Sequence, residues 1–158
     1  MMLAPPRNRI RLQRGIAMIE FAITLPVLLF LLLATAEIAR AISQYNTLTK
    51  AVRDGARYAA SQAAGASGST GLILITPQMQ TAVANLVATG NSAGSGAALL
   101  PGLSAANVTV ADAGNGYVSI TASYSYRPMI GSTLPTFGLG QPISLAMTFN
   151  AAAVMRAL

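Results

Sequence analysis

Residues 16–36 read IAMIEFAITLPVLLFLLLATA, and this apolar stretch decides the architecture of the chain. Only Glu20, Thr24 and Thr35 interrupt it with polar side chains. At 1.5 Å of rise per residue, the stretch would form a helix of roughly 31 Å, about the thickness of the hydrocarbon core of a bilayer. The sequence therefore predicts a transmembrane helix, which we place at residues 16–39 so that it includes the turn that follows.

Basic residues gather on one side of this stretch. Arg7, Arg9, Arg11 and Arg14 precede it, and they are four of the ten Lys and Arg residues in the chain. Because basic flanks stay in the cytoplasm, this bias predicts a single-pass protein with a cytoplasmic N-terminus. The remaining six basic and four acidic residues are spread out, so the net charge of +6 does not indicate a nucleic-acid partner.

The composition excludes several classes of function. The chain has no cysteine and no histidine, which rules out Cys or His zinc sites, thiol nucleophiles and His-based acid–base catalysis. Its four acids, Glu20, Glu37, Asp54 and Asp112, are far apart in sequence. We therefore expect no enzymatic activity, no metal site, no cofactor and no small-molecule substrate.

Two residues of the apolar stretch are unusual in a simple membrane anchor. Glu20 would put a carboxylate at membrane depth, at a cost of about 3 kcal/mol on insertion scales, and such a residue is by default functional. Pro26 has no N–H to donate to the carbonyl of Ala22, so we expect a kink or a local loosening of the helix. If the chain were cut between Gly15 and Ile16, the new amine could meet the Glu20 carboxylate of a neighbouring helix. Glu20 is then a candidate subunit-assembly residue.

The junction at residues 14–21 (RGIAMIEF) resembles the leader junction of type IV pilins, in which a glycine precedes an apolar residue and a glutamate stands fifth in the mature chain. The continuation as far as residues 53–58 (RDGARY) is similar to the TadE family of pseudopilins of tight-adherence (Flp) pilus systems. Residues 124–128 (YSYRP) and the terminal pair Met155-Arg156 also resemble that family.

This resemblance implies a processing site at Gly15 and Ile16, where a prepilin peptidase would remove residues 1–15 as a basic leader peptide. It further implies a bacterial inner-membrane protein with a periplasmic C-terminal domain, which assembles with other pilin-like subunits for pilus biogenesis, adhesion or secretion. Major Flp pilins are much shorter than this chain of 158 residues, so the resemblance is to the larger minor pilins and pseudopilins.

Two other interpretations stay open at this point. Residues 34–36 (ATA) fit an A-x-A cleavage site after an apolar run, so a signal peptidase could release a secreted or surface-displayed binding module after Ala36. Alternatively, the apolar stretch is the uncleaved anchor of a simple bitopic membrane protein.

Helical periodicity continues beyond the membrane stretch, and residues 40–63 read as an extension of the same helix. A helix from Ile16 to about Ala63 would be roughly 72 Å long, in the proportions of a pilin stalk. The glycine-rich residues 65–71 (GASGSTG) should end it. The apolar stripe of this extension comprises Ile38, Ile42, Tyr45, Leu48, Val52, Ala56 and Ala59.

Residues 64–158 read as a small extracytoplasmic α+β domain. A short helix should follow Thr76-Pro77 and close at Gly90, with Met79, Val83, Leu86 and Val87 on its apolar face. Alternating apolar and polar residues predict three antiparallel strands packed on the outer half of the long helix. The predicted strands are residues 107–111, 117–126 and 143–150, with a turn at 112–116 and a loop at 127–142.

Overall fold

The computed structural model describes residues 8–67, 73–138 and 140–157. A long helix, a short helix and a small antiparallel sheet confirm the expected α+β class. Parts of the expected leader (residues 1–7) and of the expected helix-ending segment (68–71) lie outside the described residues. The elements are α1 (Asn8–Ser67), α2 (Pro77–Thr89), η2 (Ala105–Asn107), β1 (Val108–Gly114), β2 (Tyr117–Ser125), β3 (Thr133–Leu134), β4 (Ile143–Ser144) and β5 (Thr148–Arg156).

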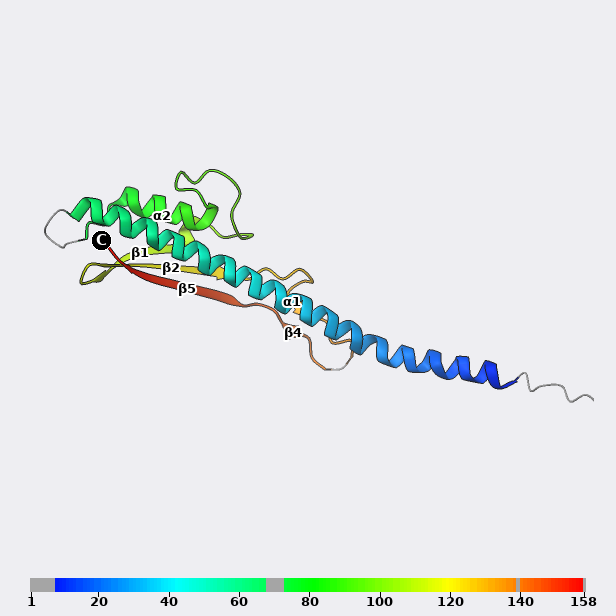
Figure 1. The fold of residues 1–158 in the computed structure, drawn as a ribbon. Coiled ribbons are helices and arrows are strands. Elements are labelled where there is room, and N and C mark those ends of the chain that lie inside the picture. Colours follow the sequence, from blue (N-terminus) through cyan, green and yellow to red (C-terminus); the bar gives the residue numbers. More distant parts are fainter. Residues whose placement is uncertain (1–7, 68–72, 139, 158) are drawn as a thin grey trace, which may run out of the picture.

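Helix α1 runs without interruption through the predicted anchor and its predicted extension. It begins at Asn8, earlier than the periodicity indicated, because residues 8–14 (NRIRLQR) are mostly good helix formers. Figure 1 shows that its N-terminal half extends away from the rest of the molecule, whereas its C-terminal half lies along the sheet and α2. We call residues 16–36 the anchor, and we call α1 from Glu37 onward, together with α2 and the strands, the head.

Three strands form an antiparallel sheet in the order β1-β2-β5. The predicted turn between the first two strands narrows to Asn115-Gly116, whose φ angles of 52° and 81° suit a tight hairpin turn. The predicted phase of β2 is confirmed, because its apolar side chains face the core while Thr121 is exposed. The buried side chains of this face are Val118, Ile120, Ala122, Tyr124 and, just beyond the strand, Tyr126.

The prediction of one third strand at residues 143–150 is wrong in its boundaries. β4 pairs with β3 in a separate two-stranded sheet, and β5 completes the main sheet from Thr148 to Arg156. The alternation that suggested the strand is real, but Ile143 and Met147 are 48% and 41% exposed, so they do not face the core. The next two inward positions of β5 after Phe149 are alanines, Ala151 and Ala153, which carry little sequence signal, and Met155 is the last inward position.

Helix α2 has the boundaries that its capping residues predict. The Thr76 hydroxyl accepts a hydrogen bond from the N–H of Met79 at 3.2 Å, and Gly90 ends the helix with a φ of 76°. The helix packs closely on α1 at Gly55, where an added Cβ would lie 2.6 Å from a methyl carbon of Val87. The core of the head lies between α1, α2 and the sheet, and its largest fully buried side chains are Tyr124, Leu48, Ile120, Val52, Val83, Val87 and Val118.

Candidate functional site

The predicted processing site lies in the first half of α1. Gly15 and Ile16 are both helical and exposed, and Ile16 is 64% exposed. A Cβ added at Gly15 would meet nothing within 4 Å, so packing against the described residues does not require glycine at this position. The glycine is accessible, as a protease site must be, and cleavage after it stays a prediction.

Glu20 is exposed on the surface of the anchor. The hydroxyl of Thr24 donates to the backbone carbonyl of Glu20 at 3.0 Å and leaves the carboxylate untouched. Among the described side chains, the ion pair present is Asp54 with Arg57 at 4.0 Å, on the head. The Glu20 carboxylate is therefore presented outward, where a group from another molecule could reach it.

Pro26 lies inside α1 and does not interrupt the helix. The anchor also keeps its hydroxyl groups hydrogen-bonded within the helix, as a lipid environment demands. Thr24 donates to Glu20, and Thr35 donates to the carbonyl of Leu31 at 2.9 Å. The predicted kink at Pro26 stays a prediction.

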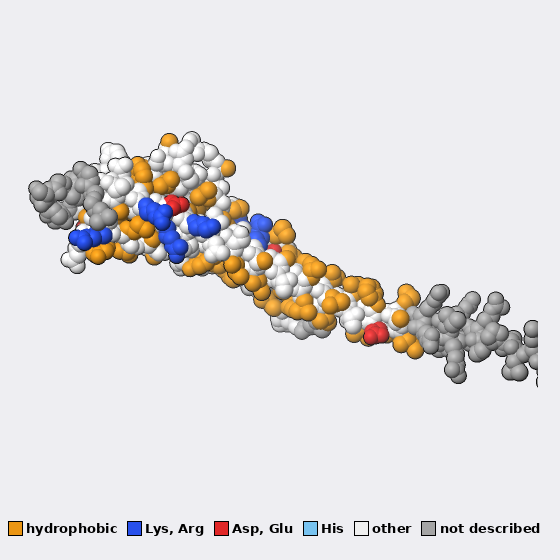
Figure 2. Space-filling model, viewed as in Figure 1, with side chains coloured by type: hydrophobic (Ala, Val, Ile, Leu, Met, Phe, Trp, Pro, Cys, Tyr) orange, Lys and Arg blue, Asp and Glu red, His pale blue; other side chains and the backbone are white. Residues whose placement is uncertain are grey.

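The surface of the anchor is apolar and uncovered. Within the described residues, α1 is the one helix that is long and apolar enough to cross a membrane, judged by its length and composition. Figure 2 shows hydrophobic side chains along this half of the molecule and Lys and Arg side chains over the head. The large exposed side chains of the anchor include Ile16, Met18, Ile19, Phe21, Ile23, Leu28, Leu31 and Leu32.

Glu37, which sequence reasoning did not single out, is only 4% exposed and sits where the anchor meets the head. Its carboxylate accepts a hydrogen bond from the Tyr126 hydroxyl. It also accepts bonds from the backbone N–H groups of Met129 and Ile130, at 2.8 and 2.9 Å. The buried acid is thus enclosed by donors from the segment that follows β2, which fastens this segment to α1.

A second polar contact repeats this arrangement further along α1. The Tyr124 hydroxyl donates to the side-chain carbonyl of Gln44 at 3.0 Å, and Gln44 is 7% exposed. Glu37 and Gln44 lie about two helical turns apart on one face of α1, and the two tyrosines share one face of the strand. We call these two contacts the tyrosine clamp. Glu37 and Gln44 lie off the apolar stripe that the sequence predicted, whose first members Ile38, Ile42 and Tyr45 are exposed. The alternating tyrosines were the sequence signal that could have revealed the clamp.

Both clamp tyrosines are harder to ionise than a free tyrosine. Burial, together with the hydrogen bond to Glu37 and its negative charge, raises the pKa of Tyr126 to about 12. Burial also raises the pKa of Tyr124. Both hydroxyls therefore stay protonated and able to donate throughout the physiological range.

The predicted processing site and the predicted assembly residue Glu20 lie in a different part of α1 from the clamp. The structure brings Gly15, Ile16 and Glu20 together on the exposed anchor, while Pro26 is half-buried further along it. Within the described residues, no group of three or more acids lies close enough to hold a metal ion. The geometry therefore shows an uncovered apolar helix that carries one outward carboxylate and is rigidly joined to a small folded head.

Comparison with known proteins gives a match over the first part of the chain. A search of curated proteins and a search of solved structures found no match to this chain. Residues 15–57 match a family model described as "TadE-like protein". The matched region begins at Gly15 and includes Glu20, Pro26 and Glu37, so it spans the anchor and the part of α1 that bears the clamp. Over residues 15–57 the chain is therefore similar to the TadE-like family, as the resemblance of these residues suggested.

Proposed function

We propose that this chain is a minor pilin or pseudopilin of a Tad (Flp) pilus or of a type II secretion-like machine. The anchor holds it in the bacterial inner membrane, with the N-terminus in the cytoplasm and the head in the periplasm. Prepilin peptidase removes the leader after Gly15, and the exposed face of α1 then packs against other pilin-like subunits in a filament that serves adhesion or secretion. The role is one of assembly, and no catalytic step belongs to it.

The observation that carries this proposal is the division of a single continuous helix into two unlike halves. No side chain from Gly15 to Ala36 is buried, whereas the later half of α1 supplies Leu48, Val52 and Ala56 to the core. An apolar surface of this extent needs lipid or neighbouring helices to cover it. A helix that is a membrane anchor at one end and a core element at the other suits a subunit that leaves the bilayer to join a filament.

The alternative of a module released after Ala36 is less well supported by the local geometry. Residues 34–36 are helical, and the next residue, Glu37, is buried in the tyrosine clamp. Both cleavage sites lie inside α1, but signal peptidase would have to cut next to this buried carboxylate, whereas Gly15 and Ile16 are exposed. An uncleaved bitopic protein would fit the helix equally well, but it would leave the outward position of Glu20 without a role.

The deciding experiment is mass analysis of the N-terminus of the membrane-associated protein in a host that has prepilin peptidase. The expected mature chain begins at Ile16. Gly15→Leu should leave the longer precursor, whereas the control Ala22→Leu, which changes the anchor outside the junction, should be processed normally. A mature chain that begins at Glu37 would instead support release by signal peptidase, and an intact N-terminus in the wild type would support the bitopic anchor.

A further inference from the structure

Residues 128–147 form a second apolar feature that the proposed function does not use. This segment, which we call the β3–β4 arm, reads PMIGSTLPTFGLGQPISLAM and has no Asp, Glu, Lys or Arg. Several of its large side chains are exposed: Met129 by 70%, Phe137 by 46%, Ile143 by 48% and Met147 by 41%. Uncharged sequence combined with outward apolar side chains is unusual for a surface in contact with water.

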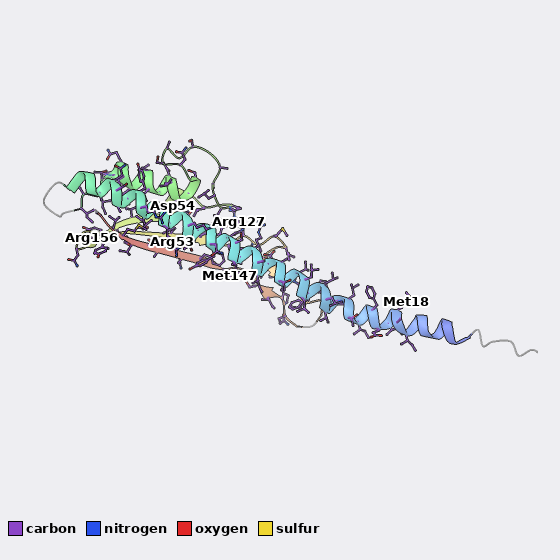
Figure 3. The ribbon with its side chains drawn as sticks, viewed as in Figure 1. Met18, Arg53, Asp54, Arg127, Met147 and Arg156 are labelled. Atoms are coloured by element: carbon purple, nitrogen blue, oxygen red, sulfur yellow. The ribbon has the colours of Figure 1, made fainter. Side chains whose placement is uncertain are left out.

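The arm folds back along α1 toward the anchor. Figure 1 shows β4 and the chain beside it extending past the end of the main sheet, next to the helix. In Figure 3, Met147 marks the end of the sheet that faces the anchor, and Arg156 marks the far end. An apolar cavity of about 440 Å³ lies between arm and helix, lined by Phe30, Ala34 and Ile38 from α1 and by Leu134, Ile143 and Leu145 from the arm.

This contact sets the depth of the arm relative to a membrane. Phe30 and Ala34 belong to the anchor, so the arm reaches beside its last two turns. If the hydrocarbon core ends near Ala36, Phe30 lies roughly 9 Å below that level. Helices that lie in the membrane interface bury their apolar faces to a depth of about 5–10 Å, so the arm has the position of an interfacial element.

The polar groups of the arm are arranged for such a position. Its two strands pair with each other, Thr133 with Ser144 and Leu134 with Ile143. The N–H of Leu145 also donates to the backbone carbonyl of Ser132 at 2.9 Å. This pairing satisfies backbone groups of residues 132–134 and 143–145, which lipid could not. At the base of the arm, the N–H groups of Met129 and Ile130 hold Glu37. The guanidinium of Arg40 also contacts the sulfur of Met129 there, at 3.9 Å, and Glu37 lines the head end of the cavity between arm and helix.

We propose that the β3–β4 arm enters the extracytoplasmic leaflet of the membrane beside α1 and contacts lipid acyl chains. The inference rests on the proposed anchoring of α1, because it takes the depth of the arm from the anchor. Continuity with the apolar anchor and the absence of charge favour acyl chains as the occupant of this surface. The chain therefore contacts the bilayer at two places, α1 and the arm, and the second contact fixes the orientation of the head relative to the membrane.

The test uses the absence of tryptophan from the chain. Full-length single-tryptophan variants are reconstituted at low density in neutral phosphatidylcholine vesicles whose acyl chains carry bromine, which quenches tryptophan in contact with it. Phe137→Trp reports on the arm, and Ile143→Trp is a second reporter in case the first variant does not fold. Leu28→Trp reports on the anchor, and Val154→Trp, 56% exposed on the outer face of β5, reports on the head.

The arm and anchor reporters should lose most of their emission in brominated vesicles, and the head reporter should keep its emission. Quenching at Leu28→Trp without quenching at either arm reporter would overturn the inference and leave the anchoring intact. Absence of quenching at all positions would overturn the anchoring itself. Arm emission that is not quenched but changes with protein density would assign the arm to contact between copies of the chain, which also overturns the inference.

Discussion

Two glutamates of α1 show how strongly position controls the role of one residue type. Glu20 is exposed on the anchor, and Glu37 is 4% exposed at the start of the head. Three donors of the same chain surround the carboxylate of Glu37, so its charge is compensated within the fold. In the described structure Glu20 has no such compensation, so in a membrane its partner must come from another molecule.

The assembly role predicts a specific defect in variants of Glu20. Glu20→Ala should insert into the membrane and be processed after Gly15 as usual, because removal of the carboxylate lowers the cost of burying the anchor. Co-purification with partner pilins and filament formation should fall sharply, because the amine of the neighbouring subunit is left unpaired. Glu20→Gln separates charge from size and should be nearly as defective. Wild-type filament levels in both variants would show that Glu20 has no assembly role.

The tyrosine clamp predicts that Glu37 and Tyr126 are energetically coupled. Glu37→Gln should lower the free energy of unfolding by about 1–3 kcal/mol, because buried donors lose a charged acceptor. Tyr126→Phe should lower it by about 1 kcal/mol, and the double variant should lose less than the sum of the two. Urea unfolding in detergent measures these differences. Glu20→Gln is the matched control on the exposed part of the same helix, and additive losses at Glu37 and Tyr126 would contradict the clamp.

The raised pKa of Tyr126 predicts a loss of stability in alkali. Its pKa is about 12 in the folded chain, against about 10 in the unfolded chain. The group therefore contributes stability that is fully present below pH ~10 and is lost as pH rises toward ~12. The advantage of the wild type over Tyr126→Phe in urea unfolding should shrink from pH ~9 to pH ~11. An advantage that is constant or grows with pH would be inconsistent with this environment.

At the scale of elements, the head depends on how closely α1 approaches α2. The two helices approach closely at Gly55, which is buried against Val83 and Val87 of α2. Glycine inside a helix costs about 1 kcal/mol relative to alanine, so close packing here has a cost in helix propensity. The absence of a side chain lets the two helices meet, and Gly55 lies inside the region that matches the TadE-like family model.

This contact predicts that Gly55→Ala destabilises the head even though alanine favours helices. The new Cβ would lie 2.6 Å from a methyl carbon of Val87, and such overpacking typically costs about 1–3 kcal/mol. Val87→Ala leaves room for that Cβ, so the double variant should be less destabilised than the two single losses together predict. Thermal unfolding of the three variants measures this. A rise in stability for Gly55→Ala alone would show that the helices can separate at no cost.

At the scale of the whole molecule, the chain divides into an anchor without a core and a head with one. The buried side chains of the described structure all lie at Glu37 or beyond it. The tyrosine clamp lies within the head, just beyond the point where α1 leaves the anchor. The β3–β4 arm reaches back across that point.

This division predicts that the head folds without the anchor. A chain starting at Glu37 retains the whole hydrophobic core and both contacts of the clamp. It should unfold cooperatively in urea and show the circular dichroism of a mixed helix and sheet protein. A mild detergent covers the apolar arm during the measurement. Gradual unfolding, or the absence of a sheet signal, would show that the head needs the anchor to fold.

The sequence by itself determined the features that depend on neighbouring residues. Apolar length predicts a helix at residues 16–36, Thr76, Pro77 and Gly90 predict α2, and alternation predicts the inward face of β2; the structure confirms these two helices and this strand face. The membrane role of residues 16–36 stays a prediction. The candidate residues Gly15, Ile16, Glu20 and Pro26 also came from local patterns, and their roles stay predictions. Such patterns are readable because helix periodicity, capping and strand alternation act over a few residues.

Only the tertiary structure decided the features that join distant parts of the chain. Glu37 looked like an ordinary polar residue of α1, because its partner Tyr126 lies 89 residues away. The alternation at 143–150 could not reveal that β4 pairs with β3 while β5 joins β2, since that choice depends on which strand edge is near. The return of the arm beside Phe30 likewise follows from the packing of α1 against the head. Contacts between distant residues form only when the whole chain has folded, so they leave no short-range pattern in the sequence.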